Sequence, residues 1–213
     1  MSLSQSFLKR ATITEDPDDE ESFPQKITPD KMLYVSALQN EVPRLISFYL
    51  SGEIKASEYY TTVFHVFRTA NPQDIIKIHI NSIGGDLDTT IQFIRVLSES
   101  NAHVIASIEG ECCSAATLIM LIADEVEITP FSTFLFHNYS SGLVGKGSEL
   151  LDQVTHYQQW ALDLFHSMYD NFLTPTEFED MLKGKDIWMS PDEVTKRLEK
   201  RNKSKKDKGL KKV

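Results

Sequence analysis

The chain has 213 residues, of which 41% are hydrophobic and 25% are charged, a composition typical of one globular domain with a sizeable core. Its net charge is −9, and the residues before 196 alone carry 12 basic and 29 acidic groups, a net charge of −17. Such an acidic body argues against nucleic acid as the main partner, because nucleic-acid binding depends on cationic side chains. No apolar run reaches the length of a membrane span, which argues against a membrane partner.

The two ends of the chain differ in charge. Residues 1–30 are polar and include the acidic run Glu15–Glu21, so we expect a flexible acidic N-terminal arm. Residues 196–213 hold ten Lys or Arg against Glu199 and Asp207, which predicts a basic, disordered tail. An electrostatic docking arm is the alternative interpretation of this basic segment.

Two further observations concern the compartment. Residues 1–10 lack the apolar run of a secretory signal, so we expect a cytoplasmic protein. Cys112 and Cys113 are adjacent and therefore poorly placed for a mutual structural disulfide. We expect both to be buried, reduced thiols.

Apolar runs and stripes with helical spacing alternate along the middle of the chain. They predict strands at 45–50, 75–80, 103–108 and 125–128, and helices at 57–70, 86–98 and 114–123. This alternation favours parallel βαβ units, so α/β is the expected fold class. Because the strands are almost continuously apolar, we expect a sheet that is covered on both faces.

A longer helix is predicted over residues 148–172, where apolar and aromatic side chains recur every three or four positions. Its stripe is more apolar than one small domain needs, which favours a contact between subunits; packing on its own domain is the alternative. Thr174 and Pro175 then have the residue types of an N-cap and a first helical position. The sequence has no GxxxxGK[ST] phosphate loop, so we expect no ATP hydrolysis by this chain.

Three apolar runs each end in residues that can do chemistry. The first leads to Gly84 and Gly85, the second to Ser114, and the third to His137. A glycine pair can direct backbone N–H groups at an oxyanion, a serine can attack a carbonyl, and a histidine can accept its proton. An acid such as Asp186 would orient the imidazole.

Each of these residues also has an ordinary alternative interpretation: a glycine turn, a helix N-cap at Ser114, a strand-end histidine, and a surface acid at Asp186. A serine hydroxyl is a weak nucleophile without a neighbouring base, so the serine and the histidine are informative only together. As a set, the residues indicate a serine hydrolase.

Four segments of the chain resemble motifs of the proteolytic subunit of the ATP-dependent Clp protease, a serine peptidase family. They are Asn81-Ser82-Ile83-Gly84-Gly85, Gly110-Glu111-Cys112-Cys113-Ser114-Ala115-Ala116, Phe134-Leu135-Phe136-His137-Asn138 and Asp186-Ile187-Trp188-Met189-Ser190. They are similar to the family's Asn-Ser-Pro-Gly-Gly turn, its nucleophile segment, its histidine segment and its aspartate segment. The interval from Gly85 to Ser114 is 29 residues, that from Ser114 to His137 is 23, and that from His137 to Asp186 is 49. These intervals are close to the family's spacing.

The resemblance implies a Clp/crotonase-type α/β spiral of repeated βαβ units with a protruding helical handle at about 145–175, within a catalytic domain at 31–195. It implies a serine endopeptidase that needs no cofactor or metal. Ser114 would be the nucleophile, His137 the general base and Asp186 its orienting acid, while the backbone N–H groups of Gly85 and Ala115 would form the oxyanion hole.

The resemblance also implies partners. In the family, two stacked rings of seven subunits receive unfolded polypeptides from a partner AAA+ unfoldase of the Clp type. Residues 1–30 and the basic tail do not match the family's sequence.

This chain departs from the family's motifs at several positions. Ile83 stands where the family has proline, Ala115 where it has methionine, and Cys112 and Cys113 where it has small residues. The alternatives are a catalytically silent, structural ring subunit, a crotonase-fold acyl-CoA enzyme, or a related peptidase of the signal-peptide or phage-prohead type.

Overall fold

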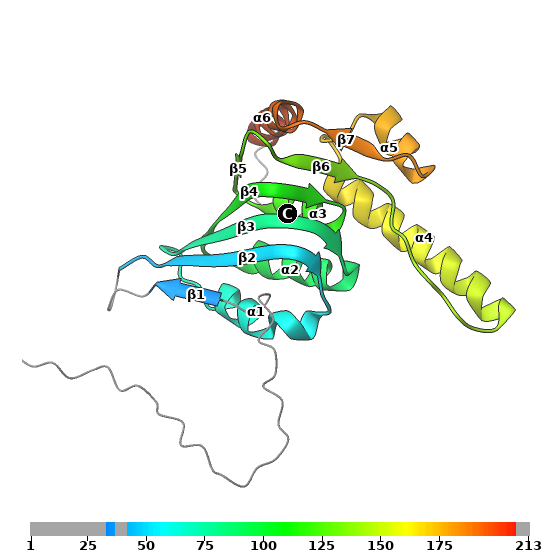
Figure 1. Cartoon of the computed structure of the whole chain (residues 1–213), viewed down its shortest axis with the longest axis horizontal. Helices are drawn as coiled ribbons and strands as arrows, with labels where there is room; N and C mark the ends of the chain where they lie inside the picture. Colours follow the sequence, from blue (N-terminus) through cyan, green and yellow to red (C-terminus); the bar gives the residue numbers. More distant parts are fainter. Residues whose placement is uncertain (1–32, 37–41, 208–213) are drawn as a thin grey trace, which may run out of the picture.

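The computed structural model describes residues 33–36 and 42–207, which form a mixed α/β fold (Figure 1). Among these residues, seven strands make one sheet in the order β1-β2-β3-β4-β6-β7, with β5 also paired to β4. The strands are β1 (Leu33–Ser36), β2 (Leu45–Ile54), β3 (Ile75–Gly85), β4 (His103–Cys113), β5 (Glu125–Ile128), β6 (Thr133–Phe136) and β7 (Ile187–Met189). The inner pairings are parallel, and only the edge strands β1 and β7 are antiparallel to their neighbours. The expected α/β class is therefore confirmed.

Helices connect the parallel strands. They are the 3-10 turn η2 (Ser57–Tyr60), α1 (Thr61–Arg68), α2 (Leu87–Glu99), α3 (Ala115–Ile122), α4 (Gly147–Tyr169), α5 (Pro175–Leu182) and α6 (Pro191–Asp207). The helix predicted at 57–70 is thus a 3-10 turn followed by a short α-helix. Thr174 accepts a hydrogen bond from the Glu177 N–H, and Pro175 is the first residue of α5, which confirms the predicted helix start.

The helices α1, α2 and α3 lie together on one face of the sheet (Figure 1). Accordingly, burial alternates along β3: Ile76, Ile78 and Ile80 are fully buried, whereas Lys77 and His79 are half-buried on the opposite face. The expectation of a sheet covered on both faces is wrong for the described residues. The face of β3 away from the helices carries Lys77 and His79 beside Ile75, so the strand alternates between apolar and polar side chains, as in a sheet with one solvated face.

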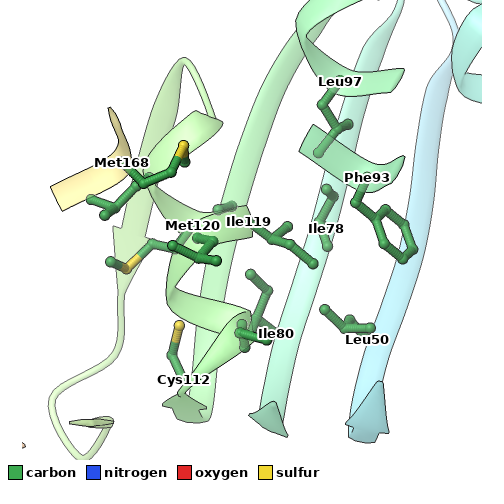
Figure 2. Close-up of a cluster of buried hydrophobic side chains, with 14 of the residues drawn as sticks. Leu50, Ile78, Ile80, Phe93, Leu97, Cys112, Ile119, Met120 and Met168 are labelled. Atoms are coloured by element: carbon green, nitrogen blue, oxygen red, sulfur yellow. The ribbon is translucent and has the colours of Figure 1, made fainter. Parts of the chain in front are cut away.

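The hydrophobic core fills the space between the sheet and these helices. Figure 2 shows Leu50, Ile78 and Ile80 of the sheet facing Phe93 and Leu97 of α2, Ile119 and Met120 of α3, and Met168 of α4. Cys112 belongs to the same cluster, and both it and Cys113 are buried, unpaired thiols, as expected. The core therefore extends to the residues directly before Ser114.

The helix α4 is divided into an exposed half and a buried half. Its N-terminal end extends away from the sheet (Figure 1), where Leu151 and Val154 are exposed. Its C-terminal end packs in the core through residues that include Phe165 and Met168. Packing on its own domain is therefore observed for the C-terminal half of the stripe, and a contact between subunits stays a prediction for the exposed half.

The basic segment at 196–213 differs from its prediction. α6 continues as helix to Asp207, whereas composition predicts disorder from residue 196. Tertiary contacts explain the difference, because the buried Arg201 side chain donates hydrogen bonds to the backbone oxygens of Leu121 and Met168. The expected N-terminal arm at 1–30 and residues 208–213 lie outside the described residues.

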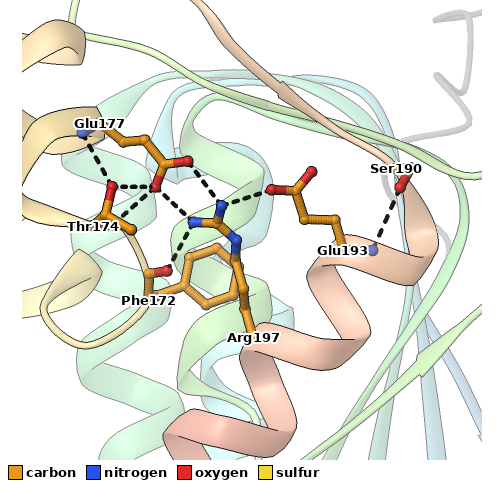
Figure 3. Close-up of polar contacts among 6 residues, drawn as sticks. All are labelled: Phe172, Thr174, Glu177, Ser190, Glu193 and Arg197. Atoms are coloured by element: carbon orange, nitrogen blue, oxygen red, sulfur yellow. Dashed lines mark hydrogen bonds and ion pairs between the residues drawn. The ribbon is translucent and has the colours of Figure 1, made fainter.

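Arg197 is a second residue of α6, after Arg201, whose side chain binds other elements of the fold. Its guanidinium donates to both carboxylate oxygens of Glu177, to Glu193 and to the Phe172 carbonyl (Figure 3). These bonds join the start of α5 to α6.

Among the residues that the structure describes, no helix combines the length and the apolar character needed to cross a membrane.

Candidate functional site

The predicted site residues meet at the edge of the sheet where parallel strands end. Gly85 is the last residue of β3, Ser114 follows β4, and His137 follows β6. Carboxyl ends of parallel strands lie at one sheet edge, so residues far apart in the sequence converge there. Gly85, Ser114, Ala115 and His137 line one small cavity of about 50 Å3.

Ser114 has an unusual backbone conformation, with φ 54° and ψ −128°. Positive φ is rare for a residue with a Cβ and costs on the order of 1–3 kcal/mol, so the surroundings must hold it in place. Its N–H donates to the Leu135 carbonyl of β6 over 2.8 Å, and its C=O accepts the Thr117 N–H over 3.0 Å.

The Ser114 hydroxyl is not used to cap the helix. Ser114 occupies the N-cap position of α3, but its side chain makes no capping hydrogen bond. The N-cap interpretation therefore explains where the residue lies but not what its hydroxyl does. The hydroxyl stands at a helix N-terminus, where backbone N–H groups favour developing negative charge.

The glycine pair ends β3 as a bulged strand rather than as a simple turn. The register of β2 with β3 shifts at Gly52, and Gly84 and Gly85 have φ values of 92° and 151°. A Cβ on Gly84 would lie 2.6 Å from the Ser114 Cβ, and one on Gly85 would lie 2.3 Å from the Ile54 carbonyl oxygen. Both glycines therefore allow backbone to approach backbone around the site.

Two further motif residues explain how β3 is held to its neighbours β4 and β2. The Asn81 side-chain oxygen accepts the Glu111 N–H over 3.0 Å. A Cβ on Gly110 would lie 2.5 Å from that oxygen, so only glycine leaves room for the Asn81 side chain. Ser82 adds a second bond, since its hydroxyl donates to the Gly52 carbonyl of β2 over 2.6 Å.

His137 and Asp186 are brought near each other by an antiparallel strand pair. Phe136 of β6 pairs with Ile187 of β7, so the next position of this register sets His137 opposite Asp186. His137 is half-buried on the cavity wall, whereas Asp186 is exposed and does not line the cavity. Within residues 42–207, no hydrogen bond joins His137 to Ser114 or to Asp186.

The structure gives contacts to residues for which the sequence analysis predicted no role of their own in the site. Asn138 donates through its side-chain amide to the Leu182 carbonyl over 3.1 Å, which ties the histidine loop to the end of α5. Phe165 and Tyr169 of α4 also line the cavity. Their helical stripe was visible in the sequence, but no local signal indicates that it reaches the end of β4.

Larger cavities lie outside the cluster around Ser114. One of about 490 Å3 shares Asn138 and Tyr139 with the small cavity and continues to Val154 and Tyr157 of α4. Another of about 700 Å3 lies between the C-terminal end of α4, α5 and α6, and it includes no predicted site residue.

In the described part of the chain, no three His, Cys, Asp or Glu residues are grouped as metal ligands would be.

Comparison with known proteins gives one family match. The family model described as Clp protease matches residues 34–197, more than half of the chain, and this segment includes every residue of the predicted site. The comparison with curated proteins found no significant match.

Proposed function

The chain belongs to the Clp protease family, and from this premise we propose that it is a serine endopeptidase with Ser114 as its nucleophile. In this proposal it is the proteolytic subunit of an ATP-dependent complex, and its substrates are unfolded polypeptides. The observation that carries the proposal is the cavity that Ser114 shares with His137, Gly85 and Ala115.

The reaction begins with attack of the Ser114 hydroxyl oxygen on a peptide carbonyl carbon. His137 accepts the hydroxyl proton as the oxygen–carbon bond forms, and Asp186 orients the imidazole. The carbonyl oxygen becomes negatively charged and is stabilised by the backbone N–H groups of Gly85 and Ala115. Each such donor contributes about 3–4 kcal/mol to transition-state stabilisation.

Collapse of the tetrahedral intermediate breaks the carbon–nitrogen bond, and His137 returns the proton to the leaving amine. Water then attacks the acyl-enzyme with His137 as general base, which releases the second product and restores the serine. The Ser114–His137–Asp186 hydrogen bonds close when substrate binds or subunits assemble, since catalytic hydrogen bonds tighten in the reacting complex.

The substrate class follows from the surroundings of Ser114. The cavity of about 490 Å3 extends the small cavity along α4, which suits a chain longer than one residue. A folded protein would first have to be unfolded by a partner, and the sequence has no phosphate loop of its own. The partner in this proposal is a cytoplasmic AAA+ unfoldase of the Clp type.

Assembly into two stacked rings of seven subunits is part of the same proposal. The exposed half of α4 presents Leu151, Val154 and Tyr157 to solvent, and apolar patches of this kind mark contact surfaces. In this proposal α4 is the handle through which the two rings meet.

One observation favours a second candidate, a catalytically silent ring subunit. Asp186 is exposed and makes no hydrogen bond to His137 in the single chain. A silent subunit would retain the fold and the α4 contact, but it would not hydrolyse peptides on its own.

The test compares the wild-type chain with Ser114→Ala and His137→Ala on an unstructured fluorogenic peptide. Both variants should lose hydrolysis by about 10⁴-fold or more, because triad members act as a unit. A fluorophosphonate should label wild type and not Ser114→Ala. Hydrolysis that persists in Ser114→Ala would refute the nucleophile, and a wild type that is neither active nor labelled would support the silent subunit.

A further inference from the structure

Tyr169, the last residue of α4, lies behind the Ser114 site. It is 1% exposed, and its hydroxyl lies 2.8 Å from the Thr117 side-chain oxygen. Its ring stacks on Phe165 and meets the edge of Phe136, with centroids 5.6 Å apart in both pairs. Phe136 directly precedes His137, the proposed base, and Thr117 is bonded to Ser114, the proposed nucleophile. Tyr169 therefore contacts a neighbour of each of these two residues.

The hydrogen bonds form a chain with a defined direction. The Thr117 hydroxyl donates its single proton to the Ser114 carbonyl over 2.7 Å. Tyr169 must therefore be the donor in its bond with Thr117. Burial raises the pKa of the Tyr169 phenol, which keeps this donor protonated at any pH at which the enzyme would work.

The end of this chain is the peptide unit between Ser114 and Ala115. A trans peptide is planar, and its C=O and N–H point in opposite directions. Whatever fixes the Ser114 carbonyl therefore also fixes the direction of the Ala115 N–H. This N–H is one of the two proposed oxyanion donors, and it follows a residue held at positive φ.

We propose that Tyr169 and Thr117 are positioning residues that hold the Ser114–Ala115 peptide so that the Ala115 N–H faces the developing oxyanion. This inference rests on the proposed function. A neighbouring contact supports it, since Arg201 donates to Leu121 at the end of α3 and to Met168 beside Tyr169. The helices α3 and α4 are thus joined directly by the Tyr169–Thr117 bond near the start of α3 and through Arg201 at its end.

The experiment compares Tyr169→Phe, Thr117→Val and the double variant in kcat and KM for peptide hydrolysis. Each single variant should lower kcat about tenfold with KM nearly unchanged, because the oxyanion donor acts in the transition state and not in substrate binding. The double variant should be no slower than either single variant, because each single substitution already breaks the same series of hydrogen bonds from Tyr169 through Thr117 to Ser114. Thr117→Ser keeps the hydroxyl and should stay within about twofold of wild type.

Ser132→Ala is the matched control. Ser132 is buried, and its hydroxyl lies 2.7 Å from the Thr129 hydroxyl and donates to the Ile108 carbonyl over 3.1 Å, which is also a hydroxyl–hydroxyl–carbonyl chain. It lies at the opposite end of β6 from His137. Ser132→Ala should lower the melting temperature but leave kcat unchanged.

The outcomes separate this inference from the proposed function. A kcat within twofold of wild type in both Tyr169→Phe and Thr117→Val, while Ser114→Ala is inactive, would overturn the positioning role alone. An equal fall in kcat in Ser132→Ala would also overturn it, because general destabilisation would then explain the effect. Activity that survives in Ser114→Ala would overturn both proposals.

Discussion

At the scale of single residues, the site depends on the absence of a side chain at position 84. Gly84 lies against Ser114 and against the backbone of Cys113 and Ala115, where a Cβ would come within 2.6–3.0 Å of their atoms. Real Cβ atoms do not approach other atoms so closely. The glycine therefore allows β3 to approach the end of β4, where the proposed oxyanion donors and the proposed nucleophile lie.

We predict that Gly84→Ala abolishes peptide hydrolysis and destabilises the fold by at least about 2 kcal/mol, through backbone strain and overpacking together. Gly52→Ala is the control, because Gly52 also has positive φ, 73°, but its Cβ would meet open space. It should cost about 1 kcal/mol and remain active. Urea unfolding and peptide turnover measure both effects, and equal behaviour of the two variants would contradict the steric explanation.

At the scale of secondary-structure elements, a single arginine joins α5 and α6. Arg197 binds Glu177, which completes the capping box of α5 with Thr174, and it also binds Glu193 within α6 (Figure 3). The hydrogen bonds from Arg197 lower the pKa of Glu177 to about 2 from its ordinary 4.5. Asp186 lies between α5 and β7, in the part of the chain that leads from α5 to α6.

The lowered pKa predicts acid sensitivity. A carboxylate with a depressed folded pKa stabilises the native state above its unfolded pKa, and this contribution is lost as pH falls from about 4.5 toward 2. We predict that Arg197→Met lowers stability at pH 7 by about 1–2 kcal/mol. Between about pH 5 and about pH 2.5, the Glu177 carboxylate becomes protonated, and the stability of Arg197→Met should fall less than that of wild type.

Thermal unfolding across this pH range measures the effect. Lys183→Met is the control, since Lys183 and Glu179 form an exposed ion pair at the C-terminal end of α5. Removing such a pair should change stability by less than about 0.5 kcal/mol. Parallel pH profiles for wild type and Arg197→Met would show that Glu177 does not titrate as proposed.

At the scale of the whole molecule, the unburied half of α4 is the clearest sign of assembly. Leu151 is 68% exposed, Val154 46% and Tyr157 40%, and they recur every three residues on one helix face. Phe165, in the same sequence stripe, is only 3% exposed and belongs to the core. A charge at Phe165 would therefore test folding, whereas charges at Leu151 and Val154 test association.

We predict that Leu151→Asp combined with Val154→Asp splits a double-ring particle into single rings or smaller species without lowering the melting temperature of the chain by more than a few degrees. Apolar area that is buried between subunits supplies the association energy, and two carboxylates would have to be desolvated there. Sedimentation velocity measures the particle size.

Asp152→Lys is the control for charge. It also changes the net charge by two units, but Asp152 lies about 100° around the helix from Leu151, away from Val154 and Tyr157. It should leave the particle intact. A wild-type chain that sediments as a 24.3 kDa monomer while it cleaves peptides would rule out α4 as a contact between rings.

Much of the architecture and of the site was predictable from the sequence. Apolar runs and stripes with helical period are local properties, and they predicted β2, β3, β4 and β5 and the helices between them, but not the short strand β6 that precedes His137. Because parallel strands end at a common edge, the sequence alone leads one to expect that Gly85, Ser114 and His137 converge there. The residue types at those ends then indicated the chemistry.

Other features depended on contacts between distant segments. The pairing of β6 with β7, which sets His137 opposite Asp186, joins positions 49 residues apart, and neither composition nor periodicity encodes that register. The helix α6 forms in a segment whose composition predicts disorder, because buried contacts of Arg201 outweigh its charge. The bond from Tyr169 to Thr117 spans 52 positions and exists only because α4 packs against α3. Sequence thus determined which residues could react, and long-range packing decided which of them meet, since side-chain contacts across elements are set by tertiary geometry rather than by local pattern.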